Sequence, residues 1–263
     1  MDDQSTRWRP WLLLALLCWP VTSPAETVRV AVAANFSRTL HGLADQFAQE
    51  SGHTLLISAG SSGKLFAQIR QGAPFHLFLS ADMERPRRLL QEGLAVPDSL
   101  FVYARGRLVL WSADPHRFAN GAHPLTAGLL TRLALGNPRS VPYGRAAREV
   151  LDGLGLSSTY DKRLVFGEDV GQVLAFVASG NAEAGFVALS QLLNPHGQPR
   201  PGSHWEVPIH LYQPVQQGAV RLPQAGPTEP TLALIRFLRA PTTRALLARQ
   251  GYLPADAADQ DLP

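Results

Sequence analysis

The sequence predicts an α/β protein with two lobes, each a mostly parallel sheet flanked by helices, the second lobe inserted into the first. Strands of the buried type alternate with amphipathic helices over residues 28–91. A weaker form of the same alternation fills the middle of the chain, and two strands and two helices follow the Pro- and Gly-rich stretch 194–202. With 263 residues, 45% hydrophobic and 17% charged, the chain is long and apolar enough for two such cores.

The first lobe opens with three strand–helix units. Val28–Ala34 is a β-branched, Ala-rich run, typical of a buried parallel strand. A helix follows with apolar residues three and four positions apart, which we expect Ser37 to cap and Gly52 to end. The next units are expected as strands over 53–59 and 75–80, a helix after the loop 60–63, and a helix that Asp82 caps and that runs to Gln91.

The middle of the chain repeats this alternation less regularly. We expect strands over 107–111, 133–135, 164–166 and 184–189, with helices over 144–151 and 170–178. The chain then returns through strands over 206–211 and 217–222 and helices over 231–238 and 242–249. Residues 26–107 and 213–263 are accordingly predicted to form lobe 1, and residues 108–212 lobe 2.

The first 25 residues are interpreted as a signal peptide that is cleaved after Ala25. Two arginines precede the apolar run 11–19, and Ser23 and Ala25 supply the small residues of a cleavage site. This run is too short to span a bilayer, which takes about 20 residues as a helix. We therefore expect a soluble, periplasmic protein. Cys18, the single cysteine, lies in this segment, so the mature chain would have none.

The composition argues against several classes of function. Lys plus Arg is 24 and Asp plus Glu is 21, giving a net charge of +3. The nearest approach to a basic cluster is the trio Arg85, Arg87 and Arg88, which a solvated helix face explains, so we expect no nucleic-acid partner. A cysteine-ligated metal cluster is excluded, and neither H-E-x-x-H nor a close histidine pair occurs. We expect no cofactor.

Polar residues stand where predicted strands give way to helices. They are Asn35, the pair Ser61 and Ser62, Tyr143, and Asp169 with Val170. At the carboxyl ends of parallel strands, helix N-termini offer free N–H groups and the positive ends of their dipoles. Each dipole end stabilises a nearby anion by about 0.3–1 kcal/mol. Four converging ends could hold a doubly charged oxyanion without a salt bridge.

Each junction taken alone has a simpler explanation as a turn or cap. The stretch Gly60–Lys64, GSSGK, is two residues short of a phosphate loop, and Leu65 stands where that loop needs Ser or Thr, so nucleotide binding is not expected. Lys64 is predicted to be a solvated helix residue. An exported serine hydrolase that uses Ser61 or Ser62 is a remote alternative, because none of the eight histidines lies at a junction and no G-x-S-x-G occurs.

The chain resembles the periplasmic molybdate-binding proteins of ABC importers. The resemblance is carried by five stretches: VAVAANF (30–36), SAGSSGKLFAQIRQGAPFHLFLSAD (58–82), LALGNPRSVPYGRAARE (133–149), FGEDVGQVLAFVASGNAEAGFV (166–187) and ALLARQGYLP (245–254). It implies a two-lobed periplasmic-binding-protein-like fold with a hinge. It also implies a monomer, not an enzyme, that closes on molybdate or tungstate and delivers it to an inner-membrane ABC permease.

The resemblance also implies an oxyanion site. Asn35 matches a small polar donor, and Ser62 matches a serine whose hydroxyl and N–H bind the anion. Tyr143 and Val170 match main-chain donors, so the amide of Tyr143 matters more than its phenol. Two positions depart from the family pattern: Ala34 replaces a hydroxyl residue and could donate only its amide, and Ala188 replaces a tyrosine ligand of other members. Molybdenum would enter only as the oxyanion, with no direct bond to the protein.

The chemistry of the donor set limits the choice of anion. Molybdate, tungstate and sulfate are fully deprotonated near neutral pH and need only donors, whereas phosphate keeps a proton that a carboxylate would accept. None of the four ligand positions is acidic, and Asp169 is expected to cap a helix. Sulfate has the same charge and shape as molybdate but is smaller. A receptor for sulfate or another tetrahedral oxyanion therefore remains open.

Overall fold

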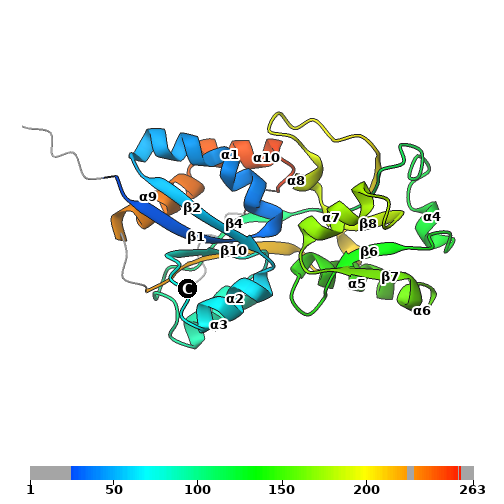
Figure 1. Cartoon of the computed structure of the whole chain (residues 1–263), viewed down its shortest axis with the longest axis horizontal. Helices are drawn as coiled ribbons and strands as arrows, with labels where there is room; N and C mark the ends of the chain where they lie inside the picture. The colour runs from blue at the N-terminus through cyan, green and yellow to red at the C-terminus, as the bar shows by residue number, and fades with distance from the viewer. Residues whose placement is uncertain (1–24, 224–227, 254, 256–263) are drawn as a thin grey trace, which may run out of the picture.

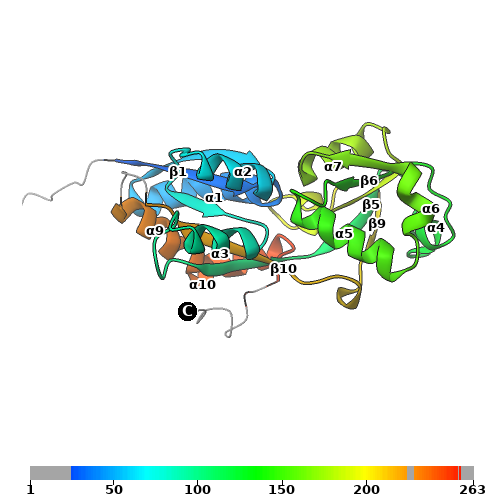
Figure 2. The same cartoon turned by 90° about the horizontal axis from the view of Figure 1, so that it is seen from below.

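The computed structural model describes residues 25–223, 228–253 and 255. Two five-stranded sheets form the centres of two lobes that lie side by side (Figures 1 and 2). The predicted α/β, two-lobed fold is confirmed. Residues 1–24 of the predicted signal peptide lie outside the described part of the chain. No helix of the described residues has both the length and the apolar character needed to cross a membrane.

The first sheet has the strand order β2-β1-β3-β10-β4. Its strands are β1 (Thr27–Ala33), β2 (Thr54–Gly60), β3 (Leu77–Leu79), β4 (Phe101–Gly106) and β10 (Val215–Arg221). β1 pairs in parallel with β2 and β3, so the carboxyl ends of these three strands meet at one edge. β10 runs antiparallel to β3 and β4, which makes the sheet mixed, and its pairing with β4 shifts register between Gln217 and Gly218.

The second sheet has the order β7-β6-β8-β5-β9. Its strands are β5 (Leu108–Ser112), β6 (Leu133–Gly136), β7 (Leu164–Gly167), β8 (Ala184–Ala188) and β9 (Ser203–Glu206). β6 pairs in parallel with β7 and β8, and β5 runs antiparallel to β8 and β9. The chain passes between the sheets from β4 to β5 through Arg107 and returns between β9 and β10. The exact lobe boundaries, 107/108 and 212/213, stay a prediction.

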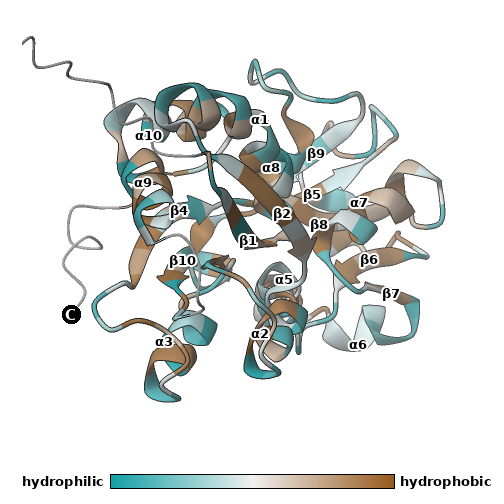
Figure 3. Cartoon of the chain, turned by 60° about the vertical axis from the view of Figure 1, so that its left-hand side comes forward, coloured by the Kyte–Doolittle hydropathy of each residue, from teal (hydrophilic) through white to brown (hydrophobic). Residues whose placement is uncertain are grey.

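Helices cover both faces of the first sheet. Alternate residues of β1 face opposite ways: Val28, Val30 and Val32 join a core with α1, α9 and α10, whereas Ala31 joins a core with α2 and α3. Figure 3 shows that the strands inside the lobes are largely hydrophobic.

The helices are α1 (Ala34–Ser51), α2 (Ser62–Arg70), α3 (Glu84–Gln91), α4 (His123–Thr126), α5 (Pro142–Gly153), α6 (Ser157–Tyr160), α7 (Val170–Ala178), α8 (Leu189–Leu192), α9 (Thr228–Arg239) and α10 (Pro241–Arg249), with 3-10 turns at Asp161–Arg163 and Ile209–Leu211.

Three local predictions need correction. α1 begins at Ala34 directly after β1, and its N-cap is Ala33 with no side-chain cap, so Ser37 lies inside the helix and does not cap it. The strand expected over 206–211 is wrong: β9 ends at Glu206, and Pro208, which has no N–H for a ladder, precedes a 3-10 turn. Strand β4 was not predicted from the sequence. Gly52 ends α1 in the left-handed conformation, as predicted.

Candidate functional site

A small cavity lies between the two lobes where strands of both sheets end. It has a volume of about 10 Å³, which is about the room that one water molecule needs. Its lining comes from the ends of β1 and β2, the starts of four helices and the segment after β3: Ala33, Ala34, Asn35, Gly60, Ser61, Ser62, Ala81, Val141, Pro142, Tyr143, Asp169 and Val170. All five residues predicted to bind an oxyanion are in this set. No Lys, Arg or His is among these described lining residues.

The cavity is surrounded by backbone N–H groups of four first helical turns. Ser62 and Val170 are the first residues of α2 and α7, and Asn35 and Tyr143 are the second residues of α1 and α5. The first four N–H groups of a helix have no acceptor within that helix. The turn, loop and cap hydrogen bonds of the described residues include none from these four amides. The cavity therefore combines free donors with four positive helix ends.

The hydroxyl of Ser62 is held in place by the backbone of the neighbouring strand end. Its Oγ accepts a hydrogen bond of 2.9 Å from the N–H of Ala81, and the side chain is buried. Because that bond uses the oxygen as acceptor, the hydroxyl proton is left to donate. Ser61 has a different role: its Oγ accepts from the N–H of Lys64 and caps α2. The sequence analysis assigned the anion-binding role to Ser62 but did not predict that Ser61 caps α2.

Asn35 is fixed through both its main chain and its side chain. Its carbonyl oxygen accepts hydrogen bonds from the hydroxyls of Tyr252 at 3.1 Å and Ser190 at 3.4 Å. Its Nδ2 donates to Oε1 of Gln217 at 2.9 Å. The side chain is 2% exposed, and its Oδ1 is buried without a hydrogen-bond partner among the described residues. Asn35 thus brings one unpartnered polar atom to the site.

Tyr143 contributes to the cavity from α5, on the opposite lobe. Its phenol is completely buried and accepts a hydrogen bond of 3.2 Å from Nε2 of Gln217. Burial raises the pKa of the Tyr143 hydroxyl well above its usual value of 10, so the phenol stays protonated. The hydroxyl lies against Gly106, where an added Cβ would be only 1.8 Å from it. The phenol therefore reaches toward the strands that connect the lobes.

The strand-to-helix junction at the start of α7 has a conventional helix cap. Asp169 precedes α7, and its Oδ1 accepts a hydrogen bond of 3.0 Å from the N–H of Gln172, as the sequence predicts. Asp169 is the one acidic side chain among the described lining residues. Val170, which follows it, is buried and brings a main-chain N–H to the cavity.

The two lobes touch directly beside the cavity. The N–H of Gly63 donates to the carbonyl oxygen of Ser140 at 2.9 Å, and an added Cβ on Gly63 would lie 2.8 Å from the Ser140 Cα. Nη2 of Arg85, which also pairs with Asp82, donates to the carbonyl oxygen of Arg139 at 3.0 Å. Such close contacts define a closed arrangement in which the glycine is required.

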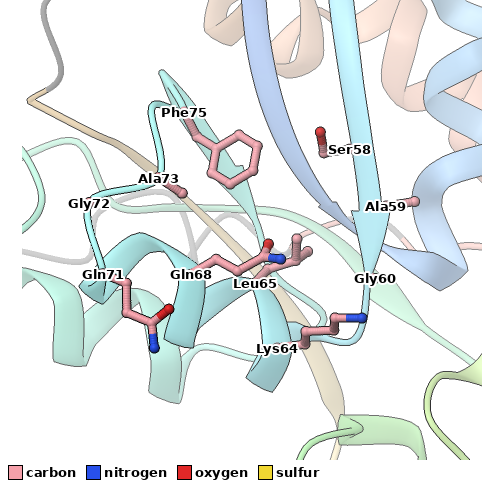
Figure 4. A pocket seen from close by; sticks show the side chains of 10 residues that line it. All are labelled: Ser58, Ala59, Gly60, Lys64, Leu65, Gln68, Gln71, Gly72, Ala73 and Phe75. Carbon is pink, nitrogen blue, oxygen red and sulfur yellow. The ribbon is translucent and has the colours of Figure 1, made fainter.

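The structure also gives the positions of three further residues that the sequence analysis named. Ala34 lines the cavity and offers only its backbone. Ala188, the second predicted departure from the family pattern, is fully buried and is not among the described lining residues. Lys64 is exposed and lines a different, larger groove together with Ser58, Gln68, Gln71 and Phe75 (Figure 4). Sequence analysis missed Ala81, whose amide fixes Ser62, and Gln217, which touches both Asn35 and Tyr143.

The fold and the site define a two-lobed binding protein with its cavity between the lobes, and comparisons with known proteins agree. Residues 28–253 match the family model described as "Bacterial extracellular solute-binding protein". The chain belongs to this family.

Its relatives make the identification more specific. The chain is 42% identical to the molybdate-binding protein ModA of Rhodobacter capsulatus over 229 residues, which is 87% of this chain and 89% of that protein. The structure of the periplasmic molybdate-binding protein of Azotobacter vinelandii matches with a TM-score of 0.83 and 39% identity, over 87% of this chain and all of that one. The resemblance found in the sequence is confirmed. The sulfate-binding protein SubI of Mycobacterium tuberculosis shares the fold, with a TM-score of 0.74, 14% identity and coverage of 89% and 88%.

Proposed function

We propose that this protein binds molybdate, and also tungstate, between its two lobes and delivers the anion to an ABC permease in the inner membrane. The observation that supports this most is the convergence of four helix starts on one inter-lobe cavity with no basic side chain in its lining. A cavity of this kind attracts an anion through fixed dipoles and N–H donors. The names and functions of the relatives select the anion.

The geometry supports a specific set of donors. We propose the hydroxyl and N–H of Ser62, the side chain of Asn35 and the N–H groups of Tyr143 and Val170 as ligands, with the N–H of Ala34 as an additional donor. Because the cavity holds only about 10 Å³, a four-oxygen anion requires the lobes to separate slightly from the arrangement described here. Affinity then depends on how well the lobes close around the anion.

The lining favours a fully deprotonated dianion. Protonated phosphate would need an acceptor, and the one acidic side chain among the described lining residues, Asp169, caps its own helix through Oδ1, which leaves Oδ2 as its other acceptor. Sulfate offers the same charge and shape, so cavity size decides between sulfate and molybdate. A sulfate receptor is the alternative function, supported by the donor-only lining. Hydrolysis by Ser62 is disfavoured because no histidine is among the described lining residues.

The remaining parts of the proposal concern the mature protein. We propose export to the periplasm with cleavage after Ala25, action as a monomer without a cofactor or a catalysed reaction, and lobes that divide at residues 107/108 and 212/213. The five strands of each sheet fall within the corresponding lobe.

Calorimetric titration tests the function. The purified protein, stripped of co-purified anion by partial unfolding and refolding, is titrated separately with molybdate, tungstate, sulfate and phosphate. We expect tight one-to-one binding of molybdate and tungstate and weak or absent binding of sulfate and phosphate. Sulfate binding as tight as that of molybdate would establish the alternative, and no heat with any of the four would reject both.

A further inference from the structure

A buried glutamine connects the oxyanion-site residues of the two lobes without lining the cavity. Gln217 lies on β10, is completely buried and sits at the register shift of this strand. Its Oε1 accepts from Nδ2 of Asn35 and from the hydroxyl of Tyr103, both at 2.9 Å, and its Nε2 donates to the hydroxyl of Tyr143 at 3.2 Å. Asn35 and Tyr143 belong to helices on opposite sides of the cavity.

In this network the hydrogen-bond donors and acceptors do not match one to one. The Tyr103 hydroxyl has one proton and two acceptors, Oε1 of Gln217 and the carbonyl oxygen of Ser80 at 3.1 Å. The hydroxyl of Tyr143 accepts from Gln217, and no acceptor for its own proton is found among the described residues. Oδ1 of Asn35 is buried without a partner there. A buried polar atom without a partner destabilises the protein.

A half turn of both side-chain amides gives every proton of this network an acceptor except the two on Nδ2 of Asn35. Tyr103 then donates to Ser80, and Tyr143 donates to Oε1 of Gln217. Nε2 of Gln217 donates to Oδ1 of Asn35 and to the Tyr103 oxygen. The heavy atoms keep their places, and amide oxygen and nitrogen are nearly equal in size. The one atom left without a protein partner is Nδ2 of Asn35, in the position that Oδ1 occupied.

The two orientations present opposite chemistry to a ligand. An unpartnered carbonyl oxygen repels an oxyanion, whereas an unpartnered N–H donates to it. We propose that Gln217 is a positioning residue that turns the Asn35 amide so that its N–H groups face the bound anion. This inference rests on the proposed function, because an anion in the cavity is what selects the turned orientation.

The same network links donor orientation to closure of the lobes. In the turned orientation, the proton that fixes Gln217 comes from Tyr143, which is carried by α5 of the second lobe. Gly106 leaves room for this phenol to reach Gln217, since any Cβ there would overlap the hydroxyl and crowd Nε2 of Gln217 at 2.8 Å. When the lobes separate, Tyr143 withdraws and Gln217 loses the donor that sets its direction. The full donor strength of Asn35 is thus available only in the closed protein.

A double-mutant cycle tests the proposal. Molybdate dissociation constants are measured by calorimetry for the wild type, Gln217→Met, Asn35→Ala and the double variant. Thr243→Val, which alters a completely buried polar residue outside the cavity lining, is the control. We expect Gln217→Met to weaken binding by about tenfold in the wild-type background and by less than about twofold when Asn35 is already alanine. The control should stay within about twofold of the wild type.

The possible outcomes separate the two proposals. Molybdate binding by the wild type together with equal weakening by Gln217→Met in both backgrounds would overturn the positioning role, as would no weakening at all. Absence of molybdate binding by the wild type would instead reject the proposed function.

A second measurement covers the case in which Gln217→Met does not fold. In isotope-labelled wild-type protein saturated with molybdate, nuclear Overhauser cross-peaks from the Gln217 side-chain amide protons report its orientation. Cross-peaks to the Tyr103 ring are expected, and cross-peaks to the Tyr143 ring in their place would overturn the inference.

Discussion

Helix α2 borders two very different hollows. Its first residue, Ser62, lines the inter-lobe cavity of about 10 Å³, whereas Gln68 and Gln71 near its last turn line an open groove of about 650 Å³ (Figure 4). The cavity receives free N–H groups and positive helix ends. The groove lies along the side of the same helix and past its last turn, where the carbonyls of Ala67, Gln68 and Ile69 already accept hydrogen bonds from the N–H groups of residues 71–73.

This difference in polarity is why we propose the small cavity, and not the larger groove, as the binding site. The large groove has one cation, Lys64, on an exposed side chain that loses entropy whenever it is fixed. In the small cavity the donors are already held by helix geometry and by bonds such as that from Ala81 to Ser62. Binding of an oxyanion there would therefore lose little conformational entropy in ordering the donor groups.

The largest expected effect is at the cavity end of α2. Ser62→Ala removes a buried hydroxyl donor and should weaken molybdate binding by about 1.5–3 kcal/mol, the value of a hydrogen bond to a charged group. Calorimetric titration of the variant beside the wild type measures the change. An unchanged dissociation constant would show that Ser62 is not a ligand.

The next effect concerns closure. Gly63→Ala places a methyl group 2.8 Å from the Ser140 Cα and should keep the lobes apart, weakening molybdate binding by about tenfold. Gly42→Ala, within α1 and with nothing within 4 Å of the added Cβ, is the matched control. The control should leave affinity unchanged and raise the free energy of unfolding by about 0.5–1 kcal/mol. Equal affinities of the two variants would mean that the contact at Ser140 is not needed for binding.

A smaller effect is expected from an ion pair that spans the lobes. Oε2 of Glu84 lies 2.8 Å from Nη1 of Arg145, and this hydrogen bond lowers the pKa of the Glu84 carboxyl below 4.5. The pair therefore favours closure above that pH, and its contribution is lost as the pH falls through the lowered pKa. Because both side chains are about half exposed, Glu84→Gln should cost about 0–1 kcal/mol of binding at neutral pH.

The salt dependence of binding checks this pair. The effect of Glu84→Gln should shrink as ionic strength rises, since exposed charges are screened. An effect of several kcal/mol, or one that salt leaves unchanged, would contradict a surface role.

The smallest effect is expected in the groove. Lys64→Gln removes its cation but leaves the cavity donors in place, so molybdate affinity should change by less than about twofold at physiological salt. Titration of this variant beside Ser62→Ala compares the groove and the cavity directly. A loss from Lys64→Gln as large as that from Ser62→Ala would place the anion in the groove.

Sequence analysis predicted the proposed site residues whose positions follow from neighbouring elements along the chain. Asn35, Ser62, Tyr143 and Val170 each stand at a strand-to-helix junction, and parallel pairing brings such junctions to one edge. Gln217 could not be predicted, because its contact with Asn35 joins residues 182 positions apart and its β10 strand shows no junction. The start of α1 was placed too late because Ser37 is a favourable cap residue, whereas packing of Phe36 and Leu40 into the core fixes the helix from Ala34.

The most direct test of the account is the location of the anion in a crystal of the protein with tungstate, found from the anomalous scattering of tungsten. We predict one peak in the inter-lobe cavity, with anion oxygens within hydrogen-bond distance of the N–H groups of Ser62, Tyr143 and Val170. A peak beside Lys64 in the groove of α2, with the cavity free of tungsten, would contradict the claim that four helix starts form the binding site.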